Sequence, residues 1–420
     1  MTSQEAADRL NVVRQTDHWQ RAMIRLGQFD EIAAPSAWAS LEPGVAAAIK
    51  SSFRTALGRL TTELVKVRRR AEGAASYELP KLADRIGAFR QQYVRTERAL
   101  DFYGDAINSR TNPSMQATLL GLDRLAALSM RRLLEPLGKD TPLLLTYVDC
   151  GLGAAILKAG LRLWEPSVIS PAAVVKIARH NLMRPTALIH ETGHQVAHIL
   201  GWNEALADAL REELSTNSHE LATVWASWAS EIAADTYAFV QTGYASVANL
   251  HDVLAGDHDY VFAFVPGDPH PVSYLRVLLM AEMCSVCFGG RGPWQGLADS
   301  WIARYPLSTA SPDVARLVID SIPQLPRIAR ICVEKPLSVL GHRPIIYWID
   351  PAEVSPPVLS KLERAAGPSL LRSTAWSKAE AIRILALIGL RVVTDPSRME
   401  ALYAEQDLWI RRLGGMQAAA

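Results

Sequence analysis

The chain has 420 residues, of which 49% are hydrophobic, and its 44 basic and 43 acidic side chains leave a net charge of +1. This balance gives no reason to expect nucleic acid or a highly charged substrate, and no apolar run approaches the roughly 18 residues that span a bilayer. The polar first residues lack the apolar core of a signal peptide. We therefore expect an intracellular, cytoplasmic protein without a membrane span.

The first third of the chain is predicted to be helical. Residues 1–45 form a mixed segment with one helix expected around 3–26, and a helical hairpin or short coiled coil is expected within 46–140. The hairpin follows from apolar residues spaced four and three apart, with a break near 75–80. This seam consists of Phe53, Leu57, Leu60, Leu64, Val67, Ala71 and Ala74, followed by Leu82, Ile86, Phe89 and Tyr93.

The hairpin carries a basic run that could be taken for a nucleic-acid-binding patch. We interpret it as a solvated face, because acidic residues accompany it. The run and its acidic neighbours are Lys66, Arg68, Arg69 and Arg70 with Glu63 and Glu72. We therefore expect no nucleic acid, whereas the helices within 46–135 are candidates for self-association or for binding a partner protein.

Residues 112–138 predict another amphipathic helix, after which strand patterns begin. Apolar runs rich in β-branched and aromatic residues predict strands at 143–148, 155–164 and 174–179. These strands directly precede the apolar stretch 186–200. We therefore expect a small sheet next to whatever that stretch forms.

Residues 186–200 contain an H-E-x-x-H motif made by His190, Glu191 and His194. On an α-helix, positions four apart lie on one face, so both imidazoles can face one metal ion. Glu191 lies beside them and can take a proton from metal-bound water. Zinc suits such a site because it accepts imidazole and carboxylate ligands and lowers the pKa of its water to about 7. The motif predicts one zinc ion per chain.

The third ligand has several candidates. His198 continues the row of histidines, but a helix rises about 12 Å over eight residues, too far for one ion, so we expect it to pack or to support the site. Glu231 lies on an apolar helix predicted at 220–240, four residues before Asp235. Zinc bound by Glu231 would compensate this buried carboxylate pair, with Asp235 accepting the outer N–H of a ligand histidine. Weaker candidates in the polar segment 201–219 and just after it, where we expect a loop over the cleft, are Glu212, Glu213, His219 and Glu220.

The two motifs H-E-T-G-H at 190–194 and E-I-A-A-D at 231–235 together resemble the gluzincin metallopeptidases. The resemblance covers residues 186–240 and implies zinc-dependent hydrolysis of peptide bonds in a protein or peptide substrate. Carried over by position, it implies metal ligands at His190, His194 and Glu231. It also implies that Glu191 is the general base and acid, and that Asp235 supports a ligand histidine.

A second stretch, D-P-H-P-V-S-Y-L-R at 268–276, is similar to a segment of the CAAX-processing and heat-shock membrane peptidases. There the segment binds substrate or stabilises the oxyanion, which implies a catalytic role for His270. Tyr260 and Tyr274 are alternative donors to an oxyanion, and a surface turn between prolines is the alternative for His270. Those relatives are integral membrane proteins, whereas no spanning helix is expected here.

The resemblance further implies a zincin-like catalytic domain over 141–290, in which one strand within 155–180 pairs with an extended substrate. Residues 291–420 are predicted to be mostly helical, with one strand at 344–349 and a frayed end. The helices expected in this last region lie near 356–366, 376–391 and 397–413.

The four cysteines include the pair Cys284 and Cys287 at C-x-x-C spacing. A structural zinc site usually needs a second close pair, and Cys150 and Cys332 are isolated. Because the surroundings of the pair are apolar, we interpret both as buried, reduced core residues.

These patterns lead us to expect an α+β fold, a zincin-like metallopeptidase domain with a small mixed sheet and predominantly helical N- and C-terminal additions. One alternative is a non-catalytic interaction module with structural zinc. Its closed site would need a fourth ligand from His270 or His198. The other is an all-helical scaffold in which the motif is a coincidence and no stoichiometric metal binds.

Overall fold

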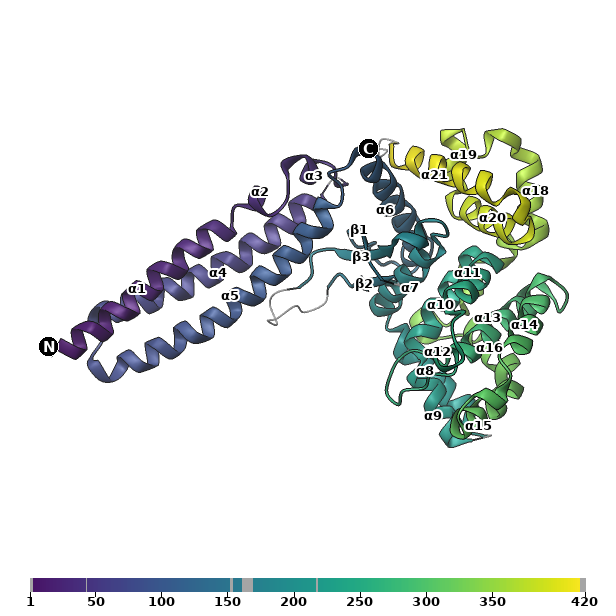
Figure 1. Cartoon of the computed structure of the whole chain (residues 1–420), viewed down its shortest axis with the longest axis horizontal. Helices are drawn as coiled ribbons and strands as arrows, with labels where there is room; N and C mark the ends of the chain where they lie inside the picture. Colours follow the sequence, from purple (N-terminus) through teal and green to yellow (C-terminus); the bar gives the residue numbers. More distant parts are fainter. Residues whose placement is uncertain (1–2, 43, 152–153, 161–168, 217, 416–420) are drawn as a thin grey trace. The chain divides into compact units, whose positions relative to one another are not determined.

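The computed structural model describes residues 3–42, 44–151, 154–160, 169–216 and 218–415. It is 76% helical with a small mixed sheet of three strands, which is compatible with the expected α+β class (Figure 1). Its contacts divide the chain into two units. Unit 1 comprises Met1–Gln116, Leu143–Tyr147 and Leu157–Val174, and unit 2 comprises Ala117–Pro142, Val148–Ile156 and Val175–Ala420.

Three long helices pack side by side in unit 1, namely α1 (Ser3–Leu26), α4 (Val45–Gly73) and α5 (Leu79–Asn108). The short helices α2 (Phe29–Ile32) and α3 (Pro35–Ala39) lie between α1 and α4 in sequence. The whole predicted seam of α4 and α5 is buried. The helical hairpin is therefore confirmed, and α1 turns it into a three-helix bundle, which the spacing did not predict.

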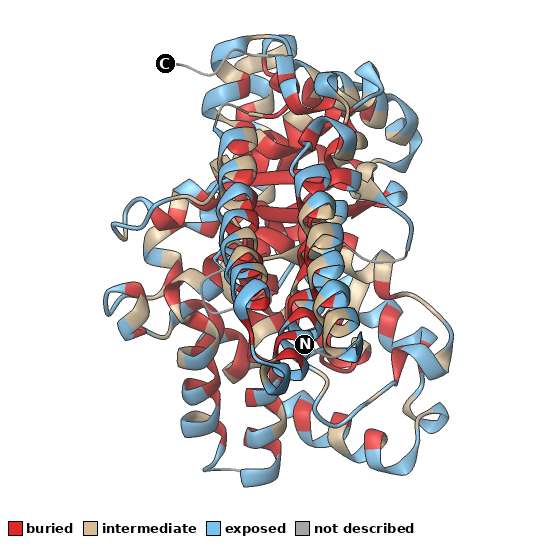
Figure 2. Cartoon of the chain, turned by 90° about the vertical axis from the view of Figure 1, so that its left-hand side faces the viewer, coloured by how far each residue is buried: buried red, intermediate tan, exposed pale blue. Residues whose placement is uncertain are grey.

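The charged residues of α1, α4 and α5 are all exposed or half-buried, and Figure 2 colours the exposed segments of these helices pale blue. Within the basic run, Lys66 pairs with Glu63, and Arg70 pairs with Glu78. Arg68 pairs with Asp17 of α1. The run therefore consists largely of ion-paired surface side chains, as expected for a solvated face.

The three strands are β1 (Leu144–Asp149), β2 (Ala155–Leu157) and β3 (Ala173–Ala178), and they pair in the order β1-β3-β2. The strands predicted at 143–148 and 174–179 are thus confirmed. The strand predicted at 155–164 is present only at its start, and residues 161–164 lie outside the described residues. β3 lies between the other two strands. Of the two strands within 155–180, where a substrate was expected to pair, β2 is therefore the one at the edge of the sheet.

Unit 2 is built almost entirely of helices. Apart from α6 (Pro113–Leu134), which begins in unit 1, they are α7 (Thr186–Leu200), α8 (Trp202–Leu214), α9 (His219–Ser227), α10 (Ala229–Thr242), α11 (Tyr244–Leu254), α12 (His258–Val261), α13 (Ser273–Phe288), α14 (Pro293–Arg304), α15 (Pro312–Ser321), α16 (Leu325–Glu334), α17 (Ile345–Trp348), α18 (Pro356–Ala366), α19 (Thr374–Ala379), α20 (Ala381–Thr394) and α21 (Met399–Gly415).

One predicted strand and one predicted loop in this unit are wrong. The segment 344–349 contains the short helix α17, because Ile345 and the residue that ends the helix, Ile349, are both buried and their spacing of four is helical. The polar segment 201–219 is mostly the helix α8, whose buried side chains recur every four residues at Trp202, Leu206, Leu210 and Leu214. Of the frayed end predicted at 414–420, Gly414 and Gly415 instead form the end of helix α21, where Gly414 is buried, and residues 416–420 lie outside the described residues.

The described residues contain no helix with both the length and the apolar character needed to cross a bilayer.

Candidate metal centre

Helix α7 carries the H-E-x-x-H motif and packs very closely on α10. A Cβ atom on Gly193 would lie 2.9 Å from the Cα of Ala234 and 3.1 Å from Cδ1 of Tyr237. Only glycine leaves room for this approach of two backbones. The apolar residues on either side of the motif, among them Leu188 and Val196, are buried. The motif helix is therefore held rigidly, with its histidines next to the start of α10.

The predicted helix at 220–240 is interrupted at Trp228. Helix α9 ends at Ser227 and α10 begins at Ala229, and the Trp228 carbonyl accepts the backbone N–H of Glu231 at 3.1 Å. The interruption places Glu231 in the first turn of α10 instead of mid-helix. A carboxylate is favoured there because the first turn of a helix carries a partial positive charge.

The structure brings the three predicted ligands together. Nε2 of His190 lies 3.5 Å from Oε2 of Glu231, and Nε2 of His194 lies 3.2 Å from Oε1. Their ligand atoms all fall within 4.8 Å of one another, and no other such group of three or more occurs among the described residues. Two donors on one tetrahedral zinc lie about 3.3 Å apart, given bonds of about 2.0–2.1 Å. The donor set therefore fits zinc both in chemistry and in spacing.

Asp235 lies behind the first ligand. Its Oδ1 is 2.9 Å from Nδ1 of His190, so the ring turns its other nitrogen towards Glu231. Burial alone would lower the pKa of His190, but the hydrogen bonds to Asp235 and Glu231 outweigh it and raise the pKa to about 10. The two carboxylates thus attract positive charge to this place. The predicted support of a ligand histidine by Asp235 agrees with this geometry.

Arg276 of α13 completes the buried cluster. Its Nε donates to Oδ2 of Asp235 at 2.6 Å, and its Nη2 lies 3.0 Å from Oε2 of Glu231. Burial would raise the pKa of the Glu231 and Asp235 carboxyl groups, but Arg276 and His190 hold both pKa values below the ordinary range. The sequence pattern included this arginine without assigning it a partner. The available signal was a lone arginine in an apolar stretch, Tyr274–Ala281, because such a residue must be paired when buried.

Glu191, the expected base, is buried on α7. Burial raises the pKa of its carboxyl group, against the attraction of His190 and His194. A carboxyl group whose pKa is raised is suited to exchanging a proton near neutral pH. Its position in the motif and its environment agree with the role of general base and acid.

His270 lies at the edge of the same cluster, with Nε2 3.7 Å from Oε1 of Glu231. Its side chain is 62% exposed, and its Nδ1 lies 2.6 Å from Oδ1 of Asp268. The alternative donors lie in other surroundings, since Tyr260 is exposed and the buried ring of Tyr274 stacks on Phe262. His270 therefore lies next to Glu231 at the edge of the cluster, outside the group of three side chains whose ligand atoms lie within 4.8 Å of one another.

The other candidates for a third ligand lie elsewhere. His198 is exposed, and the metal-ligand group does not include it. Glu212 and Glu213 on α8 pair with Lys335, and Glu213 also pairs with Arg327. His219 and Glu220 are exposed at the start of α9.

The cysteines lie outside this cluster. Cys284 and Cys332 are buried, Cys287 is half-buried, and Cys150 is exposed. Burial raises the pKa of the Cys284 thiol well above its ordinary value. The expectation of buried core residues thus holds for Cys284 and only in part for Cys287.

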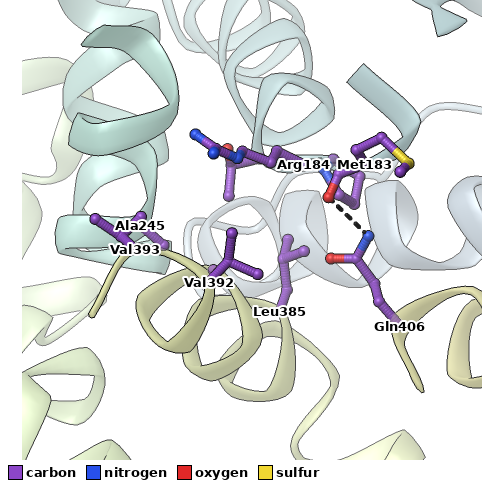
Figure 3. Close-up of a pocket in the computed structure, with 10 residues that line it drawn as sticks. Met183, Arg184, Ala245, Leu385, Val392, Val393 and Gln406 are labelled. Carbon is purple, nitrogen blue, oxygen red and sulfur yellow. Dashed lines mark hydrogen bonds between the residues drawn. The ribbon is translucent and has the colours of Figure 1, made fainter. Parts of the chain in front are cut away.

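A small pocket lies at the start of α7 (Figure 3). Residues of α7, α11, α20 and α21 and of the segment before α7 line it, and Nε2 of Gln406 donates to the Met183 carbonyl at 3.0 Å across it. None of the residues of the metal cluster lines this pocket. Its walls are mainly aliphatic, and we assign it to helix packing.

Comparisons of the chain with known protein families, with curated proteins and with solved structures give no match. The chemistry of the site therefore has to be argued from its own residues.

Proposed function

We propose that the chain is a zinc-dependent metallopeptidase of gluzincin type that hydrolyses peptide bonds in a protein or peptide substrate. The observation that carries the proposal is the convergence of His190, His194 and Glu231 within 4.8 Å, with Glu191 between the two histidines in the motif. A chance motif on a scaffold helix would have no reason to meet a buried carboxylate from a second helix.

The residues around these ligands support the same proposal. His190, His194 and Glu231 would hold one zinc ion, which when bound would lower the pKa of its water and polarise a carbonyl. Glu191 would take a proton from the attacking water and return it to the leaving amine. Asp235 keeps the ring of His190 oriented. We assign the surrounding helices and the small sheet to a zincin-like domain on this basis.

Zinc content tests the proposal directly. We expect one zinc per chain in wild type purified without chelators, and loss or loosening of the ion in Glu231→Ala. Glu220→Ala is the matched control, because this exposed glutamate in the first turn of α9 lies outside the cluster and its loss should leave zinc unchanged. Wild type without zinc would leave the motif a coincidence.

The assigned base is tested separately. Glu191→Gln should retain zinc but cleave peptides at least about 100-fold more slowly, because it removes the proton acceptor alone. If Glu191→Gln cleaves at the wild-type rate, the mechanism is wrong even where zinc is present.

A second candidate is structural zinc closed by a fourth ligand. The proximity of His270 to Glu231, at 3.7 Å, is the observation that favours it. The two readings differ in His270→Ala. A closed structural site should lose zinc affinity strongly, whereas a catalytic site should keep its ion and lose rate.

A further inference from the structure

The segment that carries His270 contains a hydrogen-bonded turn. The backbone N–H of Asp268 donates to the Val265 carbonyl at 3.0 Å, and Gly267 between them has a positive φ of 85°. With Pro266 at the second position, these are the features of a type II turn. Just before the turn, the ring of Phe264 lies 6.1 Å from that of Trp228, edge to face. The loop is therefore fixed against the residue that precedes α10.

Asp268 binds His270 twice. Its Oδ1 accepts the backbone N–H of His270 at 2.9 Å and lies 2.6 Å from Nδ1 of the ring. An ionised carboxylate only accepts hydrogen bonds, so Nδ1 carries the proton. These bonds lower the pKa of Asp268 and keep it ionised. The carboxylate thereby holds a proton on Nδ1 and fixes the orientation of the imidazole.

The selected orientation points into the metal cluster. With Nδ1 held by Asp268, the opposite nitrogen Nε2 faces Oε1 of Glu231, the same oxygen that His194 approaches at 3.2 Å. A comparison within the chain shows that capping alone does not explain this. Asp257 also accepts a backbone N–H with its side chain, that of Tyr260 three residues later at 2.8 Å, but holds no histidine ring.

We propose that Asp268 is a positioning residue for His270. It holds the Nδ1 proton of the imidazole and thereby directs Nε2 at Glu231. The inference rests on the proposed function only for its effect on cleavage, because the orientation of the ring can be measured without a substrate.

The test uses the full-length, zinc-supplemented protein labelled with ¹⁵N-histidine. Long-range ¹H–¹⁵N correlation spectra report which ring nitrogen of His270 is protonated, and the His270→Gln variant assigns its signals. In wild type we expect Nδ1 to be protonated. In Asp268→Ala we expect a second form protonated on Nε2, and in the matched control Asp257→Ala we expect the wild-type signals. Asp268→Asn retains an acceptor for the backbone N–H, so it should keep the loop folded while removing the charge.

Cleavage supplies the second measurement. Asp268→Ala should lower kcat/KM by about 10–100-fold, the usual loss when the partner of a site histidine is removed. The loss should vanish in a His270→Gln background, because the two residues act as a unit. Unchanged His270 signals in both Asp268 variants, or a loss that persists without His270, would overturn the inference. If no peptide is cleaved by wild type, the proposed function fails, and the spectra still decide the role of Asp268.

Discussion

The bundle of unit 1 and the α7–α10 pair of unit 2 are both helix packings, but they bury different groups. Helices α1, α4 and α5 bury an apolar seam and keep their ion pairs at the surface. Helices α7 and α10, together with α13, bury Glu191, Glu231, Asp235 and Arg276. Desolvating so many charges costs several kcal/mol per ion before they pair. The bundle is stabilised without this cost. The buried charges of α7, α10 and α13 are therefore one more observation in favour of the proposed metal site.

Among substitutions that compare the two regions, we expect the largest change in the free energy of unfolding at Arg276. Arg276→Met leaves the buried carboxylates of Asp235 and Glu231 without their cation, and breaking a buried pair in this way costs about 3–5 kcal/mol. Urea denaturation in the presence of a chelator should show this loss in the free energy of unfolding. Added zinc should restore part of it, because the ion supplies positive charge. A variant as stable as wild type in chelator would remove the contrast between the two regions.

The contrast also explains what the sequence could and could not predict. The seam from Phe53 to Tyr93 was predictable because spacings of four and three report burial directly. The convergence of His190, His194 and Glu231 was predictable because zinc chemistry restricts the residue types and spacings that could form such a cluster. The pairing of Arg276 with Asp235 was not, because the segment 268–276 names the arginine but no partner, and the contact depends on how α13 packs on α10.

Errors in the prediction have equally local causes. The interruption of the helix at Trp228 was not predictable, because apolar residues continue with helical spacing on both sides of it. The buried face of α8, which includes Leu206 and Leu210, was hidden by its many charged neighbours. The first error thus arises from a spacing that continues across a helix end, and the second from a composition that hides a buried face.

Two glycine substitutions give the next largest expected difference. Gly193→Ala should destabilise the chain by about 1–3 kcal/mol, because its Cβ would have to displace the backbone of Ala234. Gly58→Ala on α4 meets nothing within 4 Å and should stabilise the bundle by about 0.5–1 kcal/mol. Urea denaturation of both variants checks the opposite signs. Equal effects would mean that α7 and α10 are packed no more tightly than the exposed face of the bundle.

The smallest effect is expected at Arg68 on the bundle. This residue pairs with Asp17, and the two side chains are 39% and 41% exposed. Arg68→Met should change the free energy of unfolding by less than about 1 kcal/mol, because exposed pairs gain little in water and lose it further in salt. The variant and wild type should therefore converge in stability as salt is added, whereas Arg276→Met should keep most of its deficit. A large, salt-resistant loss at Arg68 would show that the bundle, too, depends on charges shielded from solvent.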